Sequence, residues 1–118
     1  MISKEMVGRT VVLYEPYARK AKMLQDAFEA TIDSVGRKYA QVGRCRFDCT
    51  TMACPDMNLR LYMGTLEEFR EAVELLDSTL KKMEAIRQKI DIFLPLGVMK
   101  DIDHELTMIM EGLEYATE

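Results

Sequence analysis

Residues 65–94, TLEEFREAVELLDSTLKKMEAIRQKIDIFL, decide the fold, because apolar side chains recur there at alternating spacings of three and four. That spacing lays a continuous apolar stripe along one side of an α-helix. Thr65 and Glu68 have the separation of a capping box, which marks the start of the helix. Pro95 marks its end, because proline lacks an amide donor and disfavours helical backbone in the residue before it. The sequence therefore predicts a helix from Thr65 to Leu94, about 45 Å long.

A helix of this length needs partners along its apolar stripe, so we expect the stripe to be an interaction face. Its members are Phe69, Val73, Leu76, Leu80, Met83 and Ile90. After Pro95, residues 98–115 repeat the same spacing and predict a last helix. Pro95 is interpreted as part of a turn that folds this helix back; a kinked continuation is the alternative.

Towards the N-terminus, the sequence predicts a strand followed by a second amphipathic helix. Residues 10–14, TVVLY, are β-branched and aromatic, which favours a strand. Residues 17–42 again place apolar side chains at three-and-four spacing, which predicts a helix. Gly36 and Gly43 are rival C-terminal ends, and we place the end at Gly43.

Between the two predicted long helices the period of the pattern changes to two. Residues 44–51 and 58–64 alternate apolar and polar side chains, which predicts two strands. The loop 52–57 contains proline and aspartate, so we expect a β-hairpin. The apolar side of this hairpin should face the helices and form the core, with Cys45, Phe47, Cys49, Leu59, Leu61 and Met63.

These elements give an α+β fold of order β-α-β-β-α-α, in which a small antiparallel sheet packs against long amphipathic helices. The length of 118 residues suits a single domain spanning residues 1–118. No apolar run is long enough to cross a membrane, and the first residues lack the apolar region of a signal peptide. We therefore expect a cytoplasmic protein, in which an odd count of three cysteines stays reduced.

The charge is distributed unevenly around a net value of −4. Residues 1–47 carry nine basic and five acidic side chains, whereas residues 48–118 carry seven basic and fifteen acidic ones. Packing of the two halves, or head-to-tail pairing of protomers, explains this pattern better than an anion-binding surface. Nine bases over 47 residues are not a dense basic patch.

Sulfur ligands suggest one possible metal site. Met52, Cys54 and Met57 lie in the predicted hairpin loop, and soft thiolate and thioether ligands suit Cu(I). Cys54 as a plain exposed thiol is the favoured alternative. On a strand, Cys45 and Cys49 would lie about 13 Å apart, too far to share one ion, so they are interpreted as core residues.

No catalytic set is recognisable in the sequence, and no cofactor is expected. His104 and Glu105 resemble the start of a helical zinc motif, but Met108 stands where the second histidine is needed. Glycines are dispersed, without a phosphate-binding pattern. The protein is therefore expected to be non-enzymatic, although a site assembled across an oligomer is not excluded.

A cluster of arginine and tyrosine gives the alternative function. By alternation, the side of the predicted sheet turned away from the helices carries a possible platform for phosphates and stacked bases. Its residues are Arg44, Arg46, Arg60, Tyr62 and Tyr14. A solvated face or an oligomer interface is favoured over nucleic acid, because the cluster is small and the protein acidic. The leading hypothesis is thus a protein–protein interaction or self-association module that forms a homo-oligomer or binds another protein through its helices.

Overall fold

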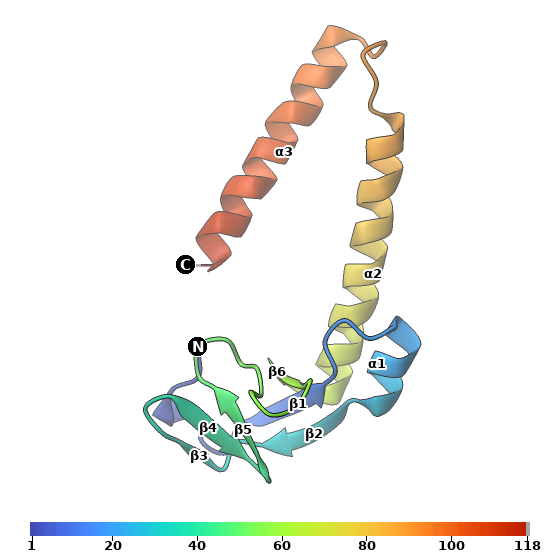
Figure 1. The fold of residues 1–118 in the computed structure, drawn as a ribbon. Coiled ribbons are helices and arrows are strands. Elements are labelled where there is room, and N and C mark those ends of the chain that lie inside the picture. The colour runs from blue at the N-terminus through green and yellow to red at the C-terminus, as the bar shows by residue number, and fades with distance from the viewer. Residues whose placement is uncertain (118) are drawn as a thin grey trace. The chain divides into compact units, whose positions relative to one another are not determined.

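The computed structural model describes residues 1–117 and has an α+β fold (Figure 1). A 3₁₀ turn, η1 (Lys4–Met6), comes first. The remaining elements are β1 (Thr10–Tyr14), α1 (Lys20–Asp26), β2 (Phe28–Thr31), β3 (Ser34–Val35), β4 (Tyr39–Val42), β5 (Cys45–Asp48), β6 (Arg60–Met63), α2 (Leu66–Lys89) and α3 (Leu96–Thr117). The fold class and the order strand, helix, strands, helix, helix are confirmed.

Residue contacts divide the chain into two compact units, which are described separately. We call residues 1–77 the β unit and residues 78–117 the helical unit. The first twelve residues of α2 belong to the β unit, and the rest of α2 belongs to the helical unit with α3.

The β unit contains two antiparallel sheets of three strands each, ordered β2-β1-β6 and β3-β4-β5. β1 is the centre of the first sheet, where Val11 lies opposite Ala30 on one side and Met63 on the other. β4 and β5 are joined by two residues, of which the first, Gly43, has φ +59°. Glycine adopts this left-handed backbone without steric cost, which permits the tight turn.

One face of each sheet contributes to a shared hydrophobic core. Val11 and Leu13 come from β1 and Leu61 from β6, while Val42 and the fully buried Phe47 come from β4 and β5. The predicted core is confirmed: Cys49 is also buried, and Cys45, Leu59 and Met63 pack against the cluster. The second sheet therefore covers the face that the sequence analysis assigned to the helices.

Helices cover the other face of the first sheet. Val12 and Ala27 are buried with Phe69, the single fully buried residue of α2 among those described. Tyr14 and Tyr62 pack against the same cluster. The alternating pattern predicted that this face of the sheet, with Tyr14 and Tyr62, points away from the helices. α2 contacts this face instead.

The helix predicted over residues 17–42 is wrong except over Lys20–Asp26, the range of α1. Residues 28–42 form β2, β3 and β4 instead, with buried Ala40 and Val42 alternating with Tyr39 and Gln41 on β4. Neither Gly36 nor Gly43 ends a helix; each lies at a hairpin turn. Long-range strand pairing and the shared core override the local helical spacing, as tertiary context commonly does.

The hairpin predicted between residues 44–51 and 58–64 is also wrong as a strand pairing. β5 pairs with β4, and β6 pairs with β1 in the other sheet. The connection keeps a few local bonds, including the Cys54 amide donating to the Leu59 carbonyl at 2.9 Å. The two strands lie where the sequence predicts them, but the alternating pattern does not indicate which strands they pair with.

The N-terminus of α2 has the predicted capping box. The Glu68 amide donates to Thr65 Oγ1, and the Thr65 amide donates to Glu68 Oε1, each at 3.2 Å. The Leu66 amide donates to Glu29 Oε2 of β2 at 2.7 Å. A carboxylate is favourable at a helix N-terminus, so these contacts fasten the start of α2 to the first sheet.

The C-terminus of α2 falls at Lys89, earlier than the predicted Leu94. Asp91 forms a turn instead, with its side chain accepting from the Phe93 amide at 3.2 Å and its carbonyl from the Leu94 amide at 3.1 Å. α3 then begins at Leu96, with the Met99 amide donating to the Pro95 carbonyl. Pro95 thus belongs to a connection between separate helices, as the favoured interpretation predicted, but α3 begins two residues before the predicted start at residue 98. Among the described residues, no helix combines the length and apolarity of a membrane span.

Candidate interaction surface

The predicted interaction face of α2 divides into a covered part and a bare part. Phe69 is 2% exposed, and its ring lies 5.0 Å from that of Tyr14 and 5.5 Å from that of Tyr62 between centroids. Val73, one helical turn further, is half-buried against the same cluster. These two residues are therefore covered by the β unit and contribute to its core.

From Leu76 onward the same face is open to solvent. Leu76, Leu80 and Met83 are each more than half exposed, and Ile90 is 40% exposed. Their spacing still follows the apolar stripe, so the exposed side chains lie on one side of α2. Four of the six predicted residues thus form a bare stripe, which Arg87 interrupts between Met83 and Ile90.

α3 carries a matching stripe that the sequence analysis recognised as helical but did not assign to the interaction face. Ile102 is half-buried, whereas Leu106, Ile109 and Leu113 are exposed. Between residues 78 and 116, for which burial is described, no residue is buried. Together, we call Leu80, Met83, Ile90, Ile102, Leu106, Ile109 and Leu113 the seam.

A groove runs between the walls provided by α2 and α3 within the helical unit. One part, of about 510 Å³, is lined by Leu80, Met83, Arg87 and Leu106 among others. The adjoining part, of about 470 Å³, shares Ile86, Ile90 and Leu106 with it and reaches Lys89, Asp101, Ile102, Glu105 and Ile109. The groove is therefore an apolar channel that has basic side chains from α2 and acidic ones from α3 among its lining.

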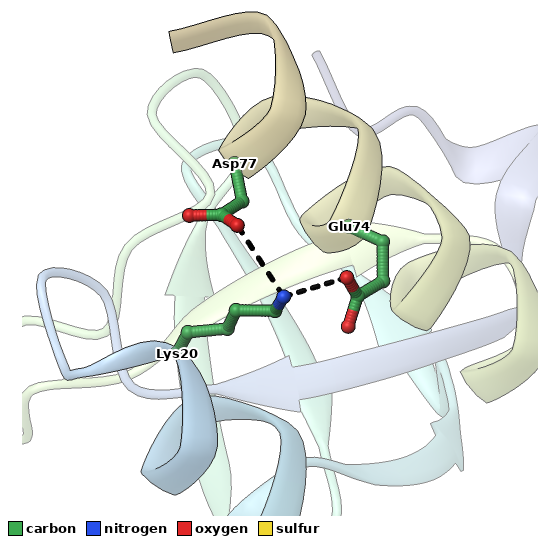
Figure 2. Close-up of polar contacts among 3 residues, drawn as sticks. All are labelled: Lys20, Glu74 and Asp77. Atoms are coloured by element: carbon green, nitrogen blue, oxygen red, sulfur yellow. Dashed lines mark hydrogen bonds and ion pairs between the residues drawn. The ribbon is translucent and has the colours of Figure 1, made fainter. Parts of the chain in front are cut away.

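Lys20 fastens α1 to α2 at the end of the β unit (Figure 2). Its ammonium group lies 2.6 Å from Glu74 Oε2 and 3.4 Å from Asp77 Oδ2. The hydrogen bond to Glu74 raises the pKa of Lys20 above its ordinary value of 10.5, with further help from Asp77. This contact holds α1 beside α2 at the point where the bare stripe begins.

The five residues of the predicted arginine–tyrosine platform are not brought to one surface. Tyr14, Arg60 and Tyr62 lie on neighbouring strands of the first sheet, with Tyr14 directly opposite Arg60. Arg44 and Arg46 lie in or beside β5 of the second sheet. Within the first sheet, Tyr14 and Tyr62 pack on Phe69 of α2.

Two of the three arginines of that set, Arg60 and Arg46, have protein partners. The Arg60 guanidinium donates to the Thr51 carbonyl at 3.0 Å. Arg46 Nε lies 3.3 Å from Asp56 Oδ2, and its guanidinium lies 4.6 Å from the centre of the Tyr39 ring. Each of these contacts engages a donor that a phosphate would otherwise use.

The sulfur-containing loop differs from the favoured sequence interpretation of it. Cys54 is buried at 8% exposure, so the expectation of an exposed thiol is wrong. Met52 is half-buried against the core, while Met57 is exposed and its sulfur lies 4.0 Å from Cys45 Sγ. Among residues 1–117, no group of three or more His, Cys, Asp or Glu residues is placed to hold a metal ion.

The remaining cysteine is a structural residue. Burial is the main cause that raises the pKa of the Cys49 thiol above its ordinary value of 9.0, and the charge of Asp48 acts in the same direction. A raised pKa keeps the thiol protonated and unreactive. Cys49 therefore contributes packing, as the sequence analysis predicted for Cys45 and Cys49.

Comparison with known proteins identifies no relative. No family model matches the chain, and neither a curated protein nor a solved structure shows significant similarity to it.

Proposed function

We propose that this protein is a non-enzymatic interaction module that self-associates through the seam of the helical unit. The observation that carries the proposal is the complete lack of buried residues from 78 to 116, in a segment with large apolar side chains at regular helical spacing. Exposed apolar patches of more than a few hundred Å² are uncommon on monomeric proteins and mark interaction surfaces.

The energetics favour the same conclusion. Fully burying a leucine or isoleucine side chain contributes about 1.5–3 kcal/mol. A lone helical unit forgoes most of this, and helices without tertiary packing are marginally stable in water. Contact between copies would cover the seam and stabilise both helices at once.

The composition of the helices suits this role. Ten methionines are present in the chain, and Met83, Met99, Met108 and Met110 are in the helical unit. Methionine is flexible and polarizable, so it adapts to a contact surface that must pack against another chain.

Two neighbouring residues of α3 provide a matched test. Ile109 is 56% and Met108 55% exposed, but Ile109 belongs to the seam and Met108 lies about 100° away around the helix. We expect Ile109→Asp to lower the mass of the full-length protein to that of the monomer in light scattering. Met108→Asp should leave the assembly intact.

The outcome that contradicts the proposal is equally specific. A well-folded wild-type protein that scatters as a monomer at all concentrations, with Ile109→Asp and Met108→Asp indistinguishable from it, would show that the seam is not a contact surface. Leu80→Asp on α2 repeats the test from the other wall of the groove.

A further inference from the structure

The two helical segments of the helical unit carry opposite charge. The last part of α2 and the residue after it, 78–90, have four basic side chains against one acidic side chain, a net charge of +3; the charged residues are Lys81, Lys82, Glu84, Arg87 and Lys89. Residues 96–117 have one basic side chain against five acidic ones, a net charge of −4; these are Lys100, Asp101, Asp103, Glu105, Glu111 and Glu114. One apolar surface is therefore bordered by a basic segment and by an acidic segment.

Most charges beside the seam follow this division; the exception is Glu84 of α2, which also lines the groove. At about 100° per residue, Lys82 and Lys89 flank the same side of the apolar stripe on α2. Asp101 and Glu105 flank the stripe of α3 in the corresponding way. Lys89, Asp101 and Glu105 all line the groove. A chain docked on the seam would therefore meet these charges at the border of the contact.

Arg87 shows that one charge lies within the apolar stripe itself. It occupies the position between Met83 and Ile90 in the three-and-four spacing, and it lines the groove. Its guanidinium lies 3.9 Å from Glu84 of the same helix, and its side chain is 84% exposed. Arginine is the basic residue enriched in interfaces, where it pairs with carboxylates through its planar donors. An acidic helix is the partner that satisfies it.

We propose that the occupant of the seam is a second copy of this chain, oriented so that the basic segment of each α2 faces the acidic α3 of the other copy. This inference rests on the proposed self-association and adds its geometry. A reciprocal arrangement places both complementary contacts in one interface, because each chain supplies one segment of each sign.

Charge reversal with mixing tests this arrangement in the full-length protein. The first variant carries Lys82→Glu and Lys89→Glu, which makes both segments acidic. The second carries Asp101→Lys and Glu105→Lys, which lowers the acidity of α3 and leaves α2 basic. We expect each variant alone to self-associate at least about tenfold more weakly than the wild type, because like charges then face each other or the attraction is lost.

The equimolar mixture is the decisive sample. The acidic α2 of the first variant then meets the lysines introduced in α3 of the second, while the unchanged α2 and α3 meet in the other contact. We expect light scattering to recover the mass of the assembled wild type in the mixture, and a salt titration to weaken that recovery.

Variants on the far side of α3 control for a general effect of charge. Lys100→Glu and Glu111→Lys lie roughly opposite the seam, so each should leave the assembly unchanged. Circular dichroism of every variant establishes that its helices are formed in the assembled state.

Three results overturn the inference. If Ile109→Asp dissociates the protein but the charge-reversed variants assemble as the wild type does, self-association stands and the charge pairing is wrong. If each variant is monomeric and the mixture is monomeric too, the opposite charges act within one chain. If the wild type is monomeric at every concentration, the proposed function falls together with the inference.

Discussion

The β unit and the helical unit hide their apolar side chains in different ways. Among the residues whose burial is described, every buried residue lies between Ile2 and Phe69, whereas residues 78–116 have none. Both units are amphipathic in sequence, and α2 belongs to both. The difference is that the β unit folds one sheet against another and an α-helix against the first sheet, while the helical unit has only two stripes to bury.

This difference explains where the interaction surface begins. The apolar stripe runs along one side of α2, but its first members face Tyr14 and Tyr62 and its later members face solvent. The surface therefore starts where the sheet stops covering the helix. We expect the two units to respond differently to the same substitution.

The largest expected difference between the units appears when a phenylalanine is replaced by alanine in each of them. Phe47→Ala removes a fully buried ring from the core between the sheets and should cost about 3–5 kcal/mol in the free energy of unfolding. Phe93→Ala removes a ring that is 91% exposed and should cost less than about 0.5 kcal/mol. Urea unfolding of both variants measures the contrast, and equal losses would break the comparison.

A second substitution sharpens the comparison at α2. Thr65→Ala removes the hydroxyl that caps the first turn of α2 and should cost about 1 kcal/mol. Thr79→Ala, on the exposed part of the same helix, should cost nothing, because alanine is the better helix former. Thermal unfolding followed by circular dichroism compares the two, and an equal loss at Thr79 would show that the later part of α2 is as firmly packed as its start.

The sequence predicted the elements whose pattern was both local and strong. Capping at Thr65 and Glu68, the strand at residues 10–14 and the alternating strands around Phe47 and Leu61 needed no knowledge of distant partners. The predicted helix was five residues too long at its C-terminus, because the turn at Asp91 ends α2 before Pro95 is reached.

The segment 28–42 could not be assigned from its period alone. Short strands separated by turns placed Phe28, Ile32, Val35, Tyr39 and Val42 at intervals that also fit a helix. A better signal was present in the alternation from Tyr39 to Asp48 on both sides of Gly43, which is the pattern of a tight hairpin. The sheet partners themselves depend on long-range contacts that no local pattern carries.

The apolar stripe of α2 lies on a helix, as its spacing predicted, but the sequence did not separate the exposed part of the stripe from the buried part. Phe69 and Leu76 have the same character and spacing, yet one is buried and the other bare. What distinguishes them is the presence of β1 and β6 beside the first turns of α2. In the sequence, the apolar spacing of residues 98–115 indicated that the helical unit has a second apolar face.

A smaller effect is expected at the contact between α1 and α2. Lys20→Met removes the ion pairs with Glu74 and Asp77 and should lower the melting temperature slightly at neutral pH. Because the pKa of Lys20 is raised, its contribution is complete below pH 10.5 and is lost as the pH rises through the higher pKa of the folded state. The difference from wild type should therefore vanish at strongly alkaline pH. A difference that persists there would assign the effect to packing of the lysine stem.

The smallest expected effect lies at the turn after β5, and it disappears in acid. The carboxylate of Asp48 accepts hydrogen bonds from the Thr51 and Thr50 amides, at 3.0 and 2.8 Å, which lowers its pKa below the ordinary value of 3.8. Its stabilisation is present above pH 3.8 and is lost as the pH falls through the lower pKa of the folded state.

Asp48→Asn retains an acceptor oxygen but loses the charge, so the variant should be slightly less stable than wild type at pH 7 and equally stable in strong acid. Unfolding measured between pH 7 and pH 2 tests this, with Asp103→Asn in the helical unit as a control that should change stability little. An acid dependence that Asp103→Asn reduces more than Asp48→Asn does would place the acid-sensitive contacts in the helical unit. That result would break the comparison, since it would show that the unit without a core of its own nevertheless controls the stability of the protein.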